Sequence, residues 1–452
     1  MHTGSCGPGH RRPTDRGGAS TMKHAGFVAT RLAGTDGVSL ETAKWAAVLK
    51  RMGIRCSFLA GELDWPAEQS VLVKEAHFNH PEVRWIDQHV WQSGARDASV
   101  TRKIHAVKDH LKERVHAFLE KYELDLRIVE NALAIPMNIP LGLALTEAIA
   151  ETAIPTIAHH HDFFWERERF LTNSVWDYLN MSFPPHLPFI RHVVINSSGD
   201  NQLSLRSGIS ATIIPNVMDF DCPPQTDEYG DDIRESLGID EDELFVLQPT
   251  RIVKRKGIEQ SIEFVAQLGL KACLVISHEG GDEGDDYEAR IHEYAARMRV
   301  KTLFASKRIG DSRSRTPSGA KIYTLADVYP RADLVTYPST FEGFGNAFLE
   351  AIYYRKPIVV NAYSVYRMDI KPQGFQCIEL DGYVSDRAVE QARTILSDDA
   401  VRHAMTEANY TLGRQYYSYK VLERKLTGLI EDLPGVSPIG EKSRGGRARD
   451  SF

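Results

Sequence analysis

Two glutamates flank a glycine-broken turn in the segment PSTFEGFGNAFLEAIYYRKPIVV at 338–360. Glu342 lies in the turn, and Glu350 follows in what we expect to be the first turns of a helix. The run DLVTY at 333–337 is typical of a strand, so the unit is a strand, a loop and a helix. Such a unit points the free N–H groups and the positive dipole end of the helix at the mouth of the loop. A phosphate suits that place, whereas Glu342 needs ligand hydroxyls or a neighbouring base as its partner.

A cluster of cations follows the first predicted strand of the second half, in the segment QPTRIVKRKG at 248–257. It comprises Arg251, Lys254, Arg255 and Lys256. Positive charges beside a helix N-terminus repel one another and the helix dipole, which is unfavourable unless an anion binds there. A diphosphate is the anion that we expect, and a solvated basic turn is the alternative.

Three consecutive histidines, His159 to His161, stand in the segment TIAHHHDFFWERERF at 156–170. Side chains on a strand alternate between its faces, so all three cannot converge on one zinc ion. We expect His161 to project into a ligand site as a hydrogen-bond donor. Asp219 and Asp221 form a D-x-D pair, but they lie in a predicted interdomain link, so we assign no metal site to them.

A glycine-containing turn follows the first predicted strand, in the segment RLAGTDGVSLETAKWAAVL at 31–49. Gly34 and Gly37 allow the backbone there to approach a phosphate or a sugar closely. Their spacing is G-x-x-G and not the G-x-G-x-x-G of dinucleotide-binding proteins, so no nicotinamide cofactor is expected. A turn without a ligand is the alternative.

The composition predicts a soluble globular protein without a general affinity for nucleic acid, since 25% of the 452 residues are charged and the net charge is −7. The five cysteines are scattered and form no C-x-x-C pair, which favours a reducing cytoplasm. No apolar stretch is long enough to span a membrane. Residues 99–122 form an amphipathic helix whose basic face could make weak peripheral contact with an anionic membrane, although packing on its own domain is favoured.

Alternating strand-like and helical segments in both halves predict two Rossmann-like α/β domains that face each other across a cleft. We expect a disordered leader at 1–21, with Met1 or Met22 as the start, and a disordered tail at 437–452. The folded parts that we expect are a first Rossmann-like domain at 22–215, a link at 216–240, a second Rossmann-like domain at 241–415 and a helix at 416–436 that returns to the first domain. The strands are predicted at 24–30, 54–60, 126–130, 154–159, 192–196, 211–214, 244–248, 272–277, 302–305, 333–337 and 357–361.

The chain resembles the retaining glycosyltransferases of family 4, the glycosyl transferases group 1, which have the GT-B fold. The resemblance covers most of residues 22–430 and implies that 22–215 is the acceptor domain and 241–415 the nucleotide-sugar domain. It is carried by four segments in the same order as in the family, of which the pair Glu342 and Glu350 is the most specific. The segments are AHHHD (158–162), ATIIPNVMD (211–219), TRIVKRKG (250–257) and ADLVTYPSTFEGFGNAFLEAI (332–352). The chain departs from the family at Thr250, where a glycine is common, and at NAF, which begins the helix at 346–348.

The resemblance implies a role for each motif residue. Arg251 and Lys256 hold the donor diphosphate, and Glu350 accepts hydrogen bonds from the nucleotide ribose. Glu342 faces the hexose, and His161 lies near its anomeric end. The backbone N–H groups of Phe344, Gly345 and Asn346 meet sugar and phosphate, and Gly34 and Gly37 close over the phosphates from the other domain.

The implied reaction is transfer of a hexosyl group with retention from a nucleotide-sugar of the UDP-glucose or GDP-mannose type to a hydroxyl-bearing acceptor. No cofactor or metal is required, and the leaving phosphate takes the acceptor proton. The acceptor is open between a small molecule, such as a glycosylglycerate precursor, and a glycan, with Asp36, Asn131 and Asn138 as candidate contacts. A GT-B phosphorylase and a non-catalytic nucleotide-sugar-binding protein are the alternatives, and the oligomeric state is open.

Overall fold

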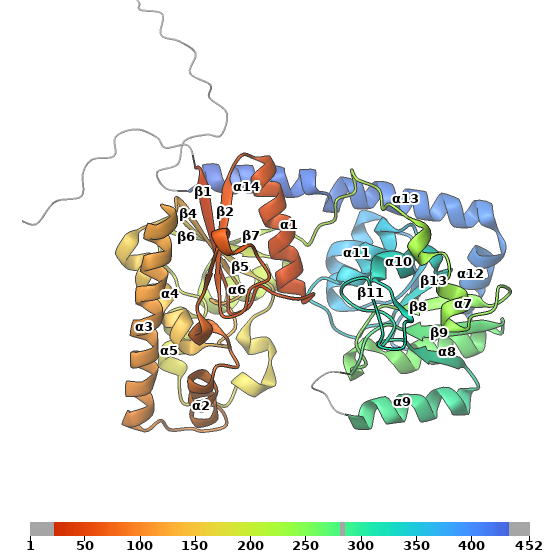
Figure 1. Ribbon diagram of the computed structural model, residues 1–452, viewed down its shortest axis with the longest axis horizontal. Coiled ribbons are helices and arrows are strands. Elements are labelled where there is room, and N and C mark those ends of the chain that lie inside the picture. The colour runs from red at the N-terminus through yellow and green to blue at the C-terminus, as the bar shows by residue number, and fades with distance from the viewer. Residues whose placement is uncertain (1–21, 281–284, 434–452) are drawn as a thin grey trace, which may run out of the picture.

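The computed structural model describes residues 22–280 and 285–433 and contains two parallel β-sheets (Figure 1). The predicted leader at 1–21 and the predicted tail at 437–452 lie outside the described residues. The first sheet has seven strands, in the spatial order β3 (Ser70–Leu72), β2 (Arg55–Ala60), β1 (His24–Val28), β4 (Leu126–Glu130), β5 (Thr156–His160), β6 (Ile190–Val194) and β7 (Ala211–Ile213). The second has six, in the order β10 (Lys301–Phe304), β9 (Ala272–Ile276), β8 (Leu244–Gln248), β13 (Leu334–Tyr337), β14 (Ile358–Asn361) and β15 (Ile378–Leu380).

Helices cover both faces of the first sheet, because successive side chains of its strands are buried on opposite sides. Val28 and Val129 share a core with one group of helices, and Phe27 and Ile128 share a second core with the other group. The first group is α2 (Pro81–Val90), α3 (Ala98–Tyr122), α4 (Ile139–Thr152), α5 (Trp176–Ser182) and α6 (Ser197–Ser207). The second is α1 (Gly37–Arg51) and α14 (Tyr419–Glu431).

The second sheet follows the same plan, so the two Rossmann-like domains predicted from the sequence are confirmed. One face packs against α8 (Ile258–Leu268), α9 (Asp285–Met298) and α12 (Asp386–Ser397). The other packs against α7 (Ile233–Leu237), α10 (Leu325–Val328), α11 (Asn346–Tyr353) and α13 (Asp399–Tyr417). A short antiparallel hairpin, β11 (Ser314–Arg315) and β12 (Lys321–Ile322), follows β10.

The chain passes between the domains at two points that lie side by side. Met218 N donates to Tyr417 O at 2.9 Å, and Met218 and Ser418 form an isolated parallel bridge. Figure 1 shows α13 lying along the second domain and α14, directly after it, along the first. The last helix therefore belongs to the first domain, where Leu422 and Leu426 are buried.

The predicted link at 216–240 is too long. Phe220, Ile233 and Ile239 are buried in the core of the second domain, and α7 lies within this segment. Prolines and acids at 222–232 interrupt the sequence near these apolar side chains, so the local pattern did not indicate a buried segment. The segment that crosses between the domains is therefore short, and most of 220–240 is part of the second domain.

The carboxyl ends of both sheets meet, since loops that follow strands of one sheet contact loops that follow strands of the other. Asn196 Nδ2, after β6, donates to Gly343 O at 2.5 Å. Ser197 N donates to Asp369 Oδ2 at 2.8 Å. Ligand sites of open parallel sheets lie at this edge, so the residues of both loops are candidates for one site.

The basic face of α3 is neutralised by acids of a neighbouring helix. Lys108 and Lys112 both form ion pairs with Glu147 of α4, at 2.8 and 2.7 Å, and Lys112 also pairs with Glu151 at 2.9 Å. These pairs leave little unpaired positive charge on α3 to attract the anionic membrane considered above. The helix is therefore a packed element of its own domain. Within residues 22–280 and 285–433, no helix is long and apolar enough to cross a membrane.

Candidate active site

The loop between β13 and α11 is held by tight backbone contacts. Gly345 has a φ of +114°, and a Cβ there would lie 2.7 Å from the Tyr363 hydroxyl, so only glycine fits. The same hydroxyl donates to Phe344 O at 2.7 Å. No side chain caps α11, so its first N–H groups are directed at the loop mouth without a side-chain partner.

Glu342 is buried in this loop and is bonded to two cations of the preceding cluster. Lys256 Nζ donates to Glu342 Oε1, and Arg255 Nη1 donates to Oε2 at 3.2 Å. Burial alone would raise the pKa of Glu342, but Lys256 and Arg255 outweigh it and lower the pKa. Of the two partners expected for Glu342, the structure therefore shows the neighbouring base.

Arg251 has a different environment from Lys256, although both come from the same segment. Its side chain is exposed, and the described part of the chain offers its guanidinium no hydrogen bond or ion pair. Lys256 is largely buried, and burial lowers its pKa against the opposing effect of Glu342. Arg251 is thus a free cation beside a paired one, which is a suitable arrangement for an incoming anion.

Glu350 lies one helical turn beyond the start of α11 and is partly buried. Its Oε2 accepts a hydrogen bond from the Tyr329 hydroxyl at 2.7 Å. Burial raises the pKa of Glu350, against the opposing effect of Tyr329. The two glutamates of the motif therefore differ: Glu342 is held as an anion by cations, and Glu350 is held by a neutral hydroxyl.

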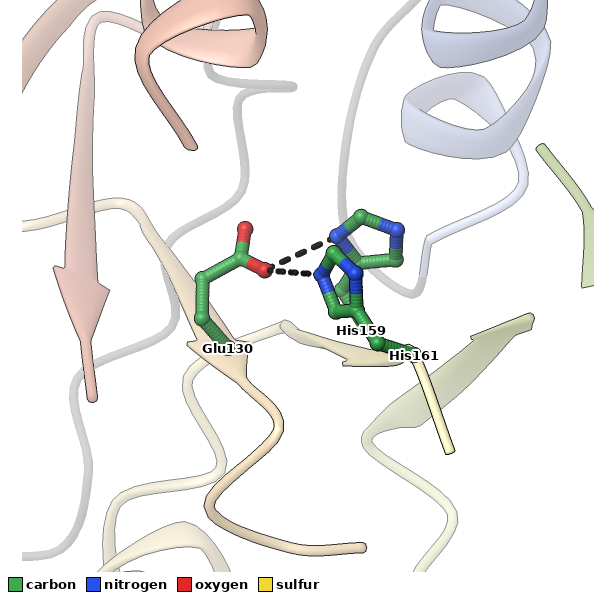
Figure 2. A group of neighbouring side chains, drawn as sticks. All are labelled: Glu130, His159 and His161. Carbon is green, nitrogen blue, oxygen red and sulfur yellow. Dashed lines mark hydrogen bonds and ion pairs between the residues drawn. The ribbon is translucent and has the colours of Figure 1, made fainter. Parts of the chain in front are cut away.

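In the first domain, Glu130, His159 and His161 converge at the ends of β4 and β5 (Figure 2). His159 Nδ1 lies 2.9 Å and His161 Nε2 3.2 Å from the same oxygen, Glu130 Oε2. The His159 ring stacks on Trp45 of α1, with 4.3 Å between the ring centroids. His159 and Glu130 are buried, whereas 11% of the His161 side chain is exposed, so only His161 can reach a ligand.

The surroundings of this cluster shift the pKa values of its two histidines in opposite directions. Burial alone would raise the pKa of Glu130, but the two histidines outweigh it and lower the pKa to about 2. Burial lowers the pKa of His159. Burial would also lower the pKa of His161, but the hydrogen bond to Glu130 raises it. With Nε2 bonded to Glu130, the Nδ1 atom of the His161 ring is left for a ligand.

His161 also lies close to the loop of the second domain. A Cβ added to Gly343 would lie 3.3 Å from His161 O, so the two backbones are in contact. His160, on the opposite side of its strand, forms a buried 2.9 Å pair with His192 and takes no part in this contact. The alternation expected along the strand thus separates His160 from His159 and His161.

Within the described residues, Glu130, His159 and His161 form the group whose side chains are close enough to bind one metal ion. Their ligand atoms all lie within 4.8 Å of one another. Two imidazoles and a carboxylate are a set that zinc accepts. The same atoms already form hydrogen bonds that compensate the charge of Glu130. Asp219 and Asp221 do not form a site together, since Asp219 pairs with Arg51 at 2.5 Å and Asp221 pairs with Arg414 at 2.9 Å.

The glycine turn after β1 reaches the second domain. Gly34 has a φ of +72°, and its N–H donates to Asp64 Oδ2 at 2.6 Å. Gly37 is the first residue of α1, and a Cβ there would lie 3.8 Å from Asn346 Nδ2. Asp36 caps α1 by accepting from Val38 N at 3.0 Å and Ser39 N at 3.2 Å. The turn therefore adjoins the start of α11.

The two asparagines that we predicted as acceptor contacts have different environments. Asn131 is partly exposed, and its side chain bonds both His161 N, at 3.1 Å, and Asp162 Oδ1, at 2.9 Å. Asn138 is buried, caps α4, and donates both amide hydrogens to the backbone of Glu75 and Ala76. Asn138 is therefore a structural residue, and its prediction as an acceptor contact is wrong.

Several side chains of this site escaped the sequence analysis. Asn216 Nδ2 donates to Asn346 Oδ1 at 2.7 Å across the domains, and Asn196 and Tyr329 make the contacts described above. Glu130 carried the clearest signal, because it is a charged residue that ends the apolar strand LRIVE. Its partner follows only from the pairing of β4 with β5, which places Glu130 directly beside His159.

Comparisons with known proteins agree with this architecture. The family model described as glycosyl transferases group 1 matches residues 318–412. The mannosylglucosylglycerate synthase of Thermotoga maritima is 31% identical over 421 residues, which are 86% of this chain and 95% of that protein. The mannosylglucosylglycerate synthase of Petrotoga mobilis is 30% identical over 441 residues, 88% of this chain and 98% of that protein.

A solved structure supports the fold. HepE of Anabaena, in complex with UDP-glucose, superimposes with a TM-score of 0.59 at 16% identity, covering 91% of this chain and 100% of that one. The likeness to the two synthases extends over both domains, so it includes the loops that meet at the candidate site. The chain belongs to glycosyltransferase family 4, the glycosyl transferases group 1, and is a glycosyltransferase with the GT-B fold.

Proposed function

We propose that this enzyme transfers a mannosyl group from a nucleoside-diphosphate sugar to glucosylglycerate, with retention at the anomeric carbon. The relatives' name describes a product with mannosyl, glucosyl and glycerate parts. Removing the mannosyl part leaves glucosylglycerate as the acceptor. GDP-mannose and UDP-glucose remain the two donor types to compare, since HepE was solved with UDP-glucose.

One observation carries the proposal: an exposed, unpaired Arg251 and an uncapped α11 lie in the domain whose loop contacts His161 of the other domain. A donor diphosphate is the anion that fits the cation and the helix end. Lys256 adds a second cation. When the donor binds, part of the hydrogen bonding of Lys256 passes from Glu342 to the phosphate. Phe344, Gly345 and Asn346 supply the backbone around the sugar, and Gly37 approaches from the first domain.

The chemistry follows from these positions. The bond between the anomeric carbon and the diphosphate oxygen breaks, and an acceptor hydroxyl forms the new bond on the same face. The acceptor proton passes to the leaving phosphate oxygen. Arg251, Lys256 and the helix end stabilise the negative charge that develops on the diphosphate. His161 donates a hydrogen bond to the sugar, and Glu130 and His159 hold its ring.

We also propose that no bound metal is required and that the enzyme acts in the cytoplasm. The cations and the helix end meet the diphosphate charge, and the carboxylates of Asp219 and Asp221 are occupied by arginines. A chelator should therefore leave transfer intact. Loss of transfer that zinc restores would point to Glu130, His159 and His161, and restoration by magnesium would point to a metal on the donor.

The proposal is tested by incubating the enzyme with glucosylglycerate and either GDP-mannose or UDP-glucose. We expect GDP-mannose, and not UDP-glucose, to give a mannosylglucosylglycerate whose new linkage has the anomeric configuration of the donor, as the one-bond C1–H1 coupling in NMR reports. Inversion would refute retention. Cleavage of the product by added inorganic phosphate, with formation of a sugar 1-phosphate, would support the phosphorylase alternative.

A further inference from the structure

Two arginines follow His161 closely in the chain and have no part in the function proposed above. Arg167 and Arg169 are carried by a pair of short 3-10 turns, Phe164–Glu166 and Glu168–Phe170, that follow β5. Both therefore lie at the carboxyl edge of the first sheet, in the domain that we assign to the acceptor.

Arg167 is tied to His161 by a short chain of hydrogen bonds. Its Nε donates to Asp162 Oδ2 at 2.8 Å. Asp162 Oδ1 in turn accepts from Asn131 Nδ2 at 2.9 Å, and Asn131 Oδ1 accepts from His161 N at 3.1 Å. The guanidinium of Arg167 is thus held at a fixed place relative to His161.

Arg169 is poorly compensated by comparison. Its Nη2 lies 2.7 Å from Met137 Sδ, a weak acceptor, and its guanidinium lies over the Phe170 ring at 4.5 Å from the centroid. No carboxylate among the described residues forms an ion pair with it. The Arg169 side chain is exposed, so a ligand can reach its guanidinium from solvent. Partial burial and the neighbouring Arg167 lower its pKa.

Asp87 of α2 is the acid that acts most strongly on Arg169, and it is a weak counter-ion. Burial raises the pKa of Asp87 to about 7, although its Oδ1 accepts a hydrogen bond from Trp91 Nε1 at 3.0 Å. A carboxyl with a raised pKa carries less negative charge near neutral pH, so Asp87 compensates Arg169 poorly.

We infer that Arg169, with Arg167 beside it, binds the carboxylate of the acceptor. This inference rests on the proposed function and names the part of the acceptor that the first domain recognises. A guanidinium presents two N–H groups that match the two oxygens of a carboxylate, so the glycerate end would be held in a fixed orientation. The far end of the acceptor, with its sugar hydroxyls, would then be directed past Asn131 toward His161.

The test compares two acceptors that differ only at this group: glucosylglycerate and glucosylglycerol, in which a hydroxymethyl replaces the carboxylate. With the wild-type enzyme we expect kcat/KM to favour glucosylglycerate at least tenfold. Arg169→Gln should raise the KM for glucosylglycerate at least tenfold and abolish the preference, with kcat and the donor KM within about threefold of wild type. Arg169→Lys should keep part of the preference for glucosylglycerate, because lysine retains the positive charge but lacks the paired N–H groups of the guanidinium.

Arg206→Gln is the matched control, since Arg206 is an exposed arginine whose guanidinium lies over the Trp165 ring at 5.3 Å. It should keep the wild-type preference. An Arg169→Gln variant that loses activity equally on both acceptors, with an unchanged melting temperature, would overturn the inference.

Failure of the proposed function gives a different result. If the wild-type enzyme transfers to neither acceptor, binding of D-glycerate is measured by calorimetry in the presence of the nucleoside diphosphate. Binding that Arg169→Gln removes and Arg206→Gln keeps would uphold the carboxylate subsite without the proposed reaction. Equal binding, or no binding, to all three proteins would overturn it.

Discussion

The charged side chains at the carboxyl ends of the two sheets differ in how completely they are paired. In the first domain, one oxygen of Glu130 is bonded by two histidines, and Asp162 is bonded by Arg167. In the second domain, Arg251 is exposed, and the described residues include no partner for it and no side chain that caps α11. The histidine cluster of the first edge is therefore paired before a ligand arrives, although Arg169 is not, whereas much of the second edge becomes compensated only when an anion binds. We therefore expect that the removal of a charged side chain has different effects on stability and turnover at the two edges.

Lys256 gives the largest expected effect, because it serves both as a donor contact and as the partner of buried Glu342. Lys256→Met leaves that carboxylate buried without its main cation, which lowers the free energy of unfolding by about 3–5 kcal/mol. Turnover should fall by about 10²–10³-fold. Urea denaturation and steady-state kinetics measure the two effects.

The double variant Lys256→Met, Glu342→Gln separates the two roles. It removes the unpaired charge, so most of the stability should return while turnover stays low. Turnover that recovers together with stability would mean that the pair is only structural, and the contrast between the two sheet edges would lose its basis.

Glu350 and Glu342 should differ in what they bind. Glu350→Ala should weaken binding of the free nucleoside diphosphate by about 1.5–3 kcal/mol, since the ribose is common to product and donor. Glu342→Ala should not weaken that binding, because it frees Lys256, but it should lower turnover more than tenfold. Calorimetry and kinetics distinguish the two, and Tyr329→Phe, which keeps the carboxylate, is the mild control. Equal loss of nucleotide affinity in both alanine variants would refute the assignment.

Acid should unfold the first domain before the second. Burial lowers the pKa of His192 to about 4, and burial also lowers the pKa of His160. The unfolded chain takes up protons below about pH 6.5 and the folded chain does not, so stability is lost as the pH falls from 6.5 toward 4. For His192 alone the loss at pH 5 is about 2 kcal/mol.

All six tryptophans lie between Trp45 and Trp176, so their fluorescence reports on the first domain alone. Acid titration followed by tryptophan fluorescence should show a transition at higher pH than circular dichroism shows for the remaining helices. His192→Gln should move the fluorescence transition to lower pH. A single transition seen by both probes, and unmoved in the variant, would contradict this prediction.

Glu130 gives the smallest effect, since it acts on the sugar only through His161. Glu130→Gln should lower turnover about tenfold. Because Glu130 raises the pKa of His161, the alkaline limb of the pH–rate profile should move to lower pH in the variant. Glu166→Gln is the control, since Glu166 lies at the same edge but bonds Gln202 and Phe163 N. An unmoved alkaline limb would show that Glu130 does not hold the His161 proton.

The sequence was sufficient for the elements with a strong local signal. The longer strands of both sheets were predicted within about two residues, because parallel strands buried on both faces are apolar throughout. The three-residue strands β3 and β15 were missed, since so short a run has no recognisable period. The loop of Glu342 was predicted from its glycines, whose backbone requirement is local.

The contacts that complete the site could not be predicted in the same way. Glu130 meets His159 only because β4 and β5 pair in one particular register. Asn138 was misassigned because a helix-capping asparagine and a ligand-binding asparagine are the same residue type after a strand. In both cases the deciding fact is a distance between segments that are far apart in the sequence.

The position of α14 has a consequence for the order in which the protein is made. The first domain begins the chain, but Leu422, Leu426 and Ile430 of its core are near the end of it. During synthesis, the second domain can complete its sheet while the first still lacks a helix over one face. A ribosome-bound chain therefore exposes an apolar surface of the acceptor domain until residues 419–431 emerge, and that surface is where a chaperone should bind the nascent protein.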